Sequence, residues 1–188
     1  MDWENIGRVW ISRTGYTGED GFEVISAAAH AEKIWNWLTK IGTVAPCGLG
    51  ARDVLRMEAG YSLYGSDMDE TVCPADCGLG FAVADGVDFV GKEALKTRIA
   101  RRRLVGLDAG DQPSVILRHG YKILSGNGAE SGTVTSGVYS KTLSRSIAFG
   151  SIAVDTPQDA PLTVDIRGRV VPVRRVSRRF VQGRVKSR

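Results

Sequence analysis

The stretch Tyr121-Lys122-Ile123-Leu124-Ser125-Gly126-Asn127-Gly128 joins a short β-prone run to a glycine–asparagine turn, and Gly132-Thr133-Val134-Thr135 follows it closely. Two such runs around such a turn predict a β-hairpin. Arg167-Gly168 is a second turn of this kind. The same pattern predicts six short strands in the second half of the chain, at 104–107, 121–124, 132–135, 146–153, 162–166 and 170–176. Strands at this spacing favour a small closed barrel or a sandwich.

The first half of the chain mixes strands and helices. The predicted strands are 6–12 and 22–25, joined by a glycine-punctuated loop, and a further strand at 79–84. Apolar residues at helical spacing predict a helix that Ser26 caps and Gly42 ends. Two more helices are expected, one from about 49 to 58 that Gly60 ends, and a short one at 92–100.

A basic junction, Arg98 to Arg103, separates these two patterns. We therefore predict an α+β protein with a boundary near residue 101. Residues 1–101 form a first α+β region, and residues 102–188 form a small C-terminal β-barrel domain with a basic tail. A chain of 188 residues has room for one large domain or two small ones.

Composition and charge narrow the classes of function. The net charge is +4, yet residues 167–188 hold nine Arg or Lys and no acid, so the remainder of the chain is net acidic. A basic tail can bind nucleic acid or an acidic partner, but it lacks interleaved aromatic residues for base stacking, so no nucleic-acid partner is expected. No apolar run is long enough for a membrane helix and the start lacks signal-peptide features, so we expect a cytoplasmic protein without a membrane partner.

The three cysteines, Cys47, Cys73 and Cys77, are sparse and odd in number. Cys73 and Cys77 have a spacing at which a metal pair can occur, but no second Cys/His pair stands nearby, and structural zinc takes four ligands. We therefore expect free thiols and no metal.

The strongest local feature is the loop from Arg13 to Glu23, whose glycines allow tight turns or close approach of the backbone to a ligand. The simplest interpretation is a hairpin loop with a structural role only. Because successive side chains of a strand point to opposite faces, the side chain of Glu23 is expected on the face opposite to that of Phe22 and Val24. Its carboxylate either faces solvent or accepts two hydrogen bonds from a planar N–H pair, such as a pterin ring offers.

Arg52 lies at the start of a predicted helix, where the positive helix end and a guanidinium together favour an anion. The alternative is a surface arginine paired with Asp53 or Glu58. Asp67, Asp69 and Glu70 resemble a carboxylate cluster, although acids in a glycine-flanked loop are usually solvated.

Several of these stretches, taken in order, resemble the glycine-cleavage T-protein family, the aminomethyltransferases. The matching words are Ser12 to Glu23, Gly48 to Asp53, Leu55 to Gly60, Leu63 to Gly65, Gly78 to Gly80, Asp88 to Leu95, Arg118 to Tyr121 and Val134 to Gly137. They extend over about residues 8–183. Leu117 and Arg179 depart from the family, which usually has proline at both positions.

The resemblance implies a fold in which a folate-binding α+β region precedes a small β-barrel. It also implies a folate site that includes Tyr16, Glu23 and Arg52, with Glu23 at the pterin end. The implied reaction transfers an aminomethyl group from lipoylated H-protein to tetrahydrofolate. Arg184, in the basic tail, is left without a role because the match is loose there.

A full T-protein has roughly another domain before the first strand, and that half carries the family's catalytic aspartate. We therefore assign no catalytic residue here and expect this chain alone to be inactive. It is expected to associate with a separate N-terminal half or with itself. The alternatives are a non-catalytic folate-binding or assembly module, and a folate-dependent relative of the demethylase type.

Overall fold

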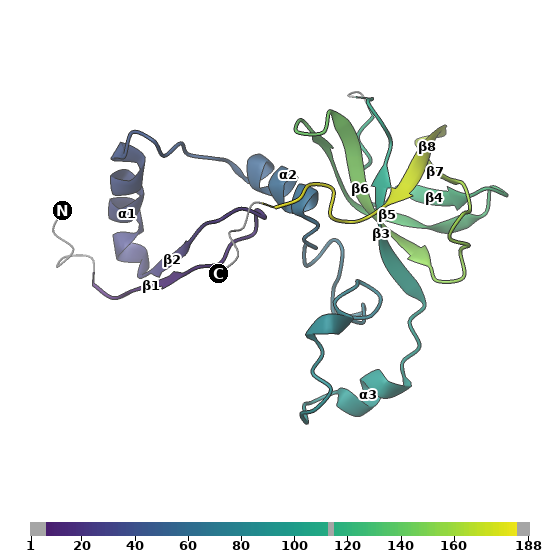
Figure 1. The fold of residues 1–188 in the computed structure, drawn as a ribbon, viewed down its shortest axis with the longest axis horizontal. Coiled ribbons are helices and arrows are strands. Elements are labelled where there is room, and N and C mark those ends of the chain that lie inside the picture. The colour runs from purple at the N-terminus through teal and green to yellow at the C-terminus, as the bar shows by residue number, and fades with distance from the viewer. Residues whose placement is uncertain (1–6, 113–114, 184–188) are drawn as a thin grey trace. The chain divides into compact units, whose positions relative to one another are not determined.

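A computed structural model describes residues 7–112 and 115–183 of the chain. The chain divides into two compact units, one made of Met1–Arg56 with Gln182–Arg188, and the other of Met57–Val181. Helices, a two-stranded sheet and a closed six-stranded barrel make up the fold (Figure 1). The prediction of an α+β chain with a small barrel in its second half is confirmed.

The first unit begins with an antiparallel pair, β1 (Val9–Ser12) and β2 (Glu23–Ser26), whose register places Ser12 opposite Glu23. Helix α1 (Ala28–Lys40) follows directly. Ser26 does not cap it, because this residue still belongs to β2 and Ala27 occupies the cap position without a side-chain bond. Helix α2 (Leu49–Ala59) ends where Gly60 adopts a φ of 88°, a left-handed conformation that favours glycine.

The predicted strand at 79–84 is wrong. This stretch instead contains a 3₁₀-helix, η2 (Gly80–Ala82), held by local bonds from Ala82 N to Leu79 O (2.9 Å) and from Val83 N to Gly80 O (3.1 Å). Its backbone therefore bonds within the turn instead of to a neighbouring strand. Helix α3 (Lys92–Thr97) is three residues shorter than predicted.

All six predicted strands of the second half are present. They are β3 (Arg102–Asp108), β4 (Lys122–Ser125), β5 (Glu130–Ser140), β6 (Arg145–Ala153), β7 (Leu162–Ile166) and β8 (Arg169–Val176). Their order is β3-β6-β5-β4-β7-β8, every pair is antiparallel, and β3 pairs with β8 to close the ring (Figure 1). The barrel, and not the sandwich, is the outcome. Closure leaves no strand edge unpaired.

Both predicted hairpin turns join neighbouring strands. Residues 126–129 connect β4 to β5, and Arg167 and Gly168 connect β7 to β8. Arg167 and Gly168 have φ values of 56° and 88°, as a type I′ turn requires. Gly168 N also donates to Oδ1 of Asp165 over 2.6 Å.

Two apolar clusters stabilise the second unit. The larger one includes Leu107, Ile123, Val134, Val164 and Val171, each at most 1% exposed. The smaller one lies on the other face of the strands and consists of Met57, Cys77, Leu104, Ile147 and Phe149. Strand β6 alternates between them, because successive side chains of a strand point to opposite faces. This strand is consequently buried on both sides.

Two buried acids tie the segments before the barrel to its strands. Glu58 Oε1 accepts a bond from Ser140 Oγ (2.6 Å). Asp67 Oδ1 accepts from Thr135 Oγ1 (2.6 Å) and its Oδ2 from Leu63 N (2.8 Å). The expectation that Asp67 is solvated is therefore wrong, since it is 4% exposed and anchors its loop to β5.

Candidate functional site

The loop between β1 and β2 is built on close backbone approach. Gly18 is buried and has a φ of 74°. The chain returns to this loop at Gly183, where an added Cβ would overlap the Gly18 carbonyl oxygen. Arg13 and Asp20 form an ion pair across the loop, with Nη2 3.3 Å from Oδ1. Residues from both ends of the described chain therefore shape this loop.

Glu23 begins β2, and its side chain is exposed. The Thr14 hydroxyl donates to Oε2 of Glu23 and lies 2.9 Å from the Ser12 hydroxyl oxygen. A carboxylate has about four lone-pair positions, so one bond from Thr14 leaves acceptor capacity on Glu23. This arrangement can orient the carboxylate toward a planar N–H pair.

Arg52 and Tyr16 come together in the same unit. The Arg52 guanidinium carbon lies 4.5 Å from the centre of the Tyr16 ring, which is a cation–π contact. Asp53 pairs with Arg56 instead, with its Oδ1 2.8 Å from Nε. The structure thus joins two of the three predicted site residues directly, while Glu23 is held separately by Thr14.

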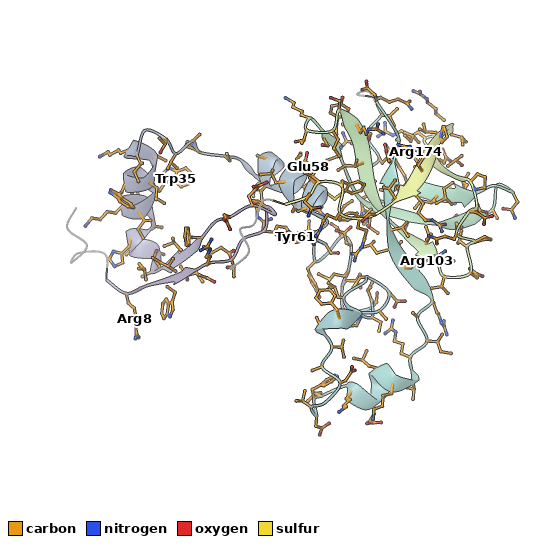
Figure 2. The ribbon with its side chains drawn as sticks, viewed as in Figure 1. Arg8, Trp35, Glu58, Tyr61, Arg103 and Arg174 are labelled. Atoms are coloured by element: carbon orange, nitrogen blue, oxygen red, sulfur yellow. The ribbon has the colours of Figure 1, made fainter. Side chains whose placement is uncertain are left out.

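Apolar side chains of the first unit are widely exposed. Trp10 and Ile11 of β1 are 59% and 64% exposed, and Trp35, labelled on α1 in Figure 2, is 55% exposed. Within residues 7–56, no apolar side chain is buried. The strands β1 and β2 pair only with each other among the described residues. This unit accordingly presents apolar surface and open strand edges, which in other proteins mark contact sites.

The other acids and cysteines singled out in the sequence lie outside the loop between β1 and β2. Asp69 and Glu70 are exposed, and hydrogen bonds from the side chain and backbone of Thr71 lower the pKa of Asp69. Cys73 and Cys77 are buried, and burial raises the pKa of the Cys77 thiol. Across residues 7–112 and 115–183, no three or more His, Cys, Asp and Glu side chains gather as a metal site would require. In the same ranges, no helix has the length and apolar character to cross a membrane.

Sequence reasoning missed Thr14 and Gly183 as parts of this site. Thr14 could have been found from the strand register, because pairing Ser12 with Glu23 brings the residues just after β1 next to the carboxylate. Gly183 had no such signal, since its contact with Gly18 joins positions 165 residues apart in the sequence. Arg184, which follows it, lies outside the described residues.

The fold defines a protein class in which an α+β region is followed by an antiparallel barrel. The family model "GCVT N-terminal domain" matches residues 1–85, and "Glycine cleavage T-protein C-terminal barrel domain" matches residues 102–182. The chain belongs to the glycine-cleavage T-protein (aminomethyltransferase) family.

The chain is also similar to individual proteins that are named aminomethyltransferases. An aminomethyltransferase of Xanthomonas campestris pv. campestris is 44% identical over 93% of this chain and 47% of its own length. One from Synechococcus sp. is 47% identical over 92% of this chain and 48% of its own. The crystal structure of glycine cleavage system aminomethyltransferase T from Bartonella henselae matches with a TM-score of 0.85 and 31% identity, over 94% of this chain and 50% of that one. The chain spans about half the length of these relatives.

Proposed function

We propose that this chain supplies the folate-recognising half of a tetrahydrofolate-dependent aminomethyl transfer from lipoylated H-protein, in the cytoplasm. In this proposal, residues 1–101 are the later part of the folate-binding domain and residues 102–188 the barrel domain. In this proposal, the transfer also needs residues of the family beyond the half of its relatives' length that these 188 residues span. The observation that carries the proposal is the arrangement of Glu23, Tyr16 and Arg52 in one compact unit.

The chemistry of these residues fits a reduced folate. The Glu23 carboxylate, steadied by Thr14, can accept the paired N–H groups of a pterin ring. Charge-assisted bonds of this kind contribute about 1.5–3 kcal/mol each. Arg52, in the first turn of α2, adds a positive charge beside the aromatic ring of Tyr16. Together they supply an acceptor, a cation and an aromatic face to one ligand.

The need for a further half is supported by the exposed apolar residues of the first unit. Trp10, Ile11 and Ile25 are each more than half exposed on the β1–β2 pair. Relatives are about twice as long as this chain. We therefore propose that the additional residues of the family cover this surface, whether they belong to a separate polypeptide or to a longer form of the same one.

Calorimetric titration with tetrahydrofolate tests the recognition step. We expect the 188-residue chain to bind, and Glu23→Gln to weaken binding by about tenfold or more, because one charge-assisted acceptor is lost. Glu19→Gln is the matched control, since Glu19 is an exposed glutamate of the same loop. Equal weakening by both variants, or no binding by the parent chain, contradicts the assignment of Glu23.

The same protein preparation tests whether turnover needs the other half of the family's length. We expect no turnover of aminomethylated H-protein and tetrahydrofolate by this chain alone, and turnover after addition of the first half of the Xanthomonas campestris relative. Turnover by the purified chain alone would show that it is a complete catalyst. Folate binding without turnover in either mixture would favour a non-catalytic folate-binding module, and turnover with a methylated amine donor in place of H-protein would favour a demethylase-type relative.

A further inference from the structure

A cavity of about 500 Å³ lies on the barrel, between β3, β8 and the loop that precedes β7. All of its lining belongs to the second unit. Arg103, labelled in Figure 2, extends from β3, and Arg175 comes from β8. The lining residues are Arg103, Leu104, Val105, Gln158, Arg175, Val176, Ser177 and Arg178. Three arginines and no acid line this cavity.

Two of these arginines have buried N–H groups without an acceptor. Arg103 donates through Nη2 to the Thr156 carbonyl oxygen, and Arg175 donates through Nη1 to Gln158 Oε1 (3.0 Å) and O (3.3 Å). Arg103 Nε and both Nε and Nη2 of Arg175 are buried and have no hydrogen-bond partner in the described part of the chain. Buried donors of folded proteins are almost always paired, so these three nitrogens lack the acceptor that such donors normally have.

The positive charges of the cavity also favour the binding of an anion. Burial, followed by the positive charge of Arg103, lowers the pKa of Arg175, and Asp159 opposes this effect. Two other arginines of the barrel are neutralised, because Arg145 and Arg174 both contact Oδ2 of Asp108, over 2.9 and 2.6 Å. The third arginine of the cavity, Arg178, donates to the Cys77 carbonyl oxygen over 3.0 Å. Within the described part of the chain, neither Arg103 nor Arg175 forms an ion pair with a carboxylate, although Asp159 lies near enough to act on Arg175.

We propose that this cavity binds an oxyanion, a phosphate or carboxylate group, through the guanidinium groups of Arg103 and Arg175. Guanidinium presents its donors in a planar fork that matches both kinds of group, and a charge-assisted bond is stronger than one between neutral partners. A bound anion would offset the repulsion between the two arginines, and the three unpartnered nitrogens would gain an acceptor if the guanidinium groups turned toward it. This site shares no residue with the folate site proposed above.

Calorimetric titration of the full 188-residue chain tests the proposal. Inorganic phosphate and glutarate are titrated separately at constant ionic strength in chloride, which distinguishes a phosphate source from a carboxylate source. We expect saturable binding in at least one arm, weakened about tenfold or more by Arg175→Gln and by Arg103→Gln, because each removes part of the donor set. Thermal unfolding in chloride alone establishes that each variant folds.

Arg169→Gln is the matched control. It removes one positive charge from the same strand, β8, at an exposed position outside the cavity. We expect its affinity for either anion to equal that of the parent chain. The proposal is overturned if neither anion binds more tightly than chloride, or if Arg169→Gln weakens binding as much as Arg175→Gln does, since binding would then follow net charge alone.

Discussion

The barrel and the first unit are stabilised in different ways. In the barrel, side chains such as Leu107, Val134 and Phe149 are fully buried, and every strand has two paired neighbours. In the first unit, α1 has no buried residue, and β1 and β2 make a sheet of only two strands among the described residues. A two-stranded sheet is marginal in water by itself. The barrel thus has its own core, whereas the loop between β1 and β2 belongs to a unit whose described residues 7–56 include no buried apolar side chain.

This difference places the candidate folate residues in the region with the fewest buried contacts. Binding loops are commonly drawn from the less stable parts of a protein, where ordering by a ligand or a partner is possible. The chain also offers separate probes of the two regions. All four tryptophans, at positions 3, 10, 35 and 37, precede residue 57, so their fluorescence reports on the first unit alone.

The largest expected effect is in amide hydrogen exchange. Amides of the barrel core, such as those of Val134 and Val164, should exchange more slowly than those of β1 and β2 by a factor on the order of 10³ or more, since they require global opening of the barrel. Mass spectrometry of peptides from the two regions measures this ratio. Similar protection in both regions would show that the first unit is as stable as the barrel and would remove the contrast.

A truncation in the barrel core should produce the next largest effect. Phe149 is fully buried, and its ring stacks on Phe180 at a centroid distance of 5.9 Å. Phe149→Ala should lower the free energy of barrel unfolding by about 3–5 kcal/mol, the usual cost of such a cavity. Urea unfolding, monitored through the amide exchange of barrel peptides, measures this change.

Trp35→Ala is the counterpart in the first unit, where the side chain is 55% exposed. We expect it to change the stability of the barrel by no more than about 0.5 kcal/mol, as surface substitutions usually do. A loss close to that of Phe149→Ala would mean that the exposed tryptophan is part of the core of the second unit.

A smaller, pH-dependent effect is expected at Asp108, which is buried on β3. Burial alone would raise the pKa of this carboxyl, but bonds from Gly110 N, Arg174 and Arg145 outweigh it and lower the pKa below its ordinary value of 3.8. A lowered pKa in the folded state stabilises the protein above the unfolded-state pKa, and this stabilisation is lost as the pH falls through the folded-state value. Asp108→Asn should therefore cost about 1.5–3 kcal/mol near pH 6.

The cost of Asp108→Asn should begin to shrink as the pH falls below about 4, where the carboxyl of the unfolded chain takes up a proton, and it should disappear only as the pH falls through the lowered folded-state pKa. Urea unfolding of the barrel at pH 6 and pH 3.5 measures both values. A difference that stays constant with pH would indicate that the substitution acts through shape and not through the charge of the carboxylate.

Much of the barrel was predictable because its strands have local signals. Turn residues such as Asn127 and Gly168 separate short β-prone runs, and the strands formed where those runs stand. Closure into a ring was left open against a sandwich, because it depends on the pairing of β3 with β8, about 70 residues apart. The prediction of a strand at 79–84 was wrong because an apolar run next to glycines fits a strand as well as a 3₁₀ turn.

The site was predictable in its residues and less so in its contacts. A resemblance to a family and the chemistry of each side chain indicated Tyr16, Glu23 and Arg52. The contact of Arg52 with Tyr16 could not be foreseen, since an acidic neighbour, Asp53, was equally available and pairs with Arg56 instead. Asp67 was misjudged because its partner, Thr135, lies 68 residues away in the sequence.

The approach of Gly183 to Gly18 has a consequence for handling the protein. Residues 7–56 and residues 182 and 183, which lie at the two ends of the described ranges, belong to the first unit. A side chain at position 183 would displace the Gly18 carbonyl. An affinity tag or fluorophore is better inserted in the exposed turn at Asn127 and Gly128, where the chain reverses between two barrel strands of the second unit.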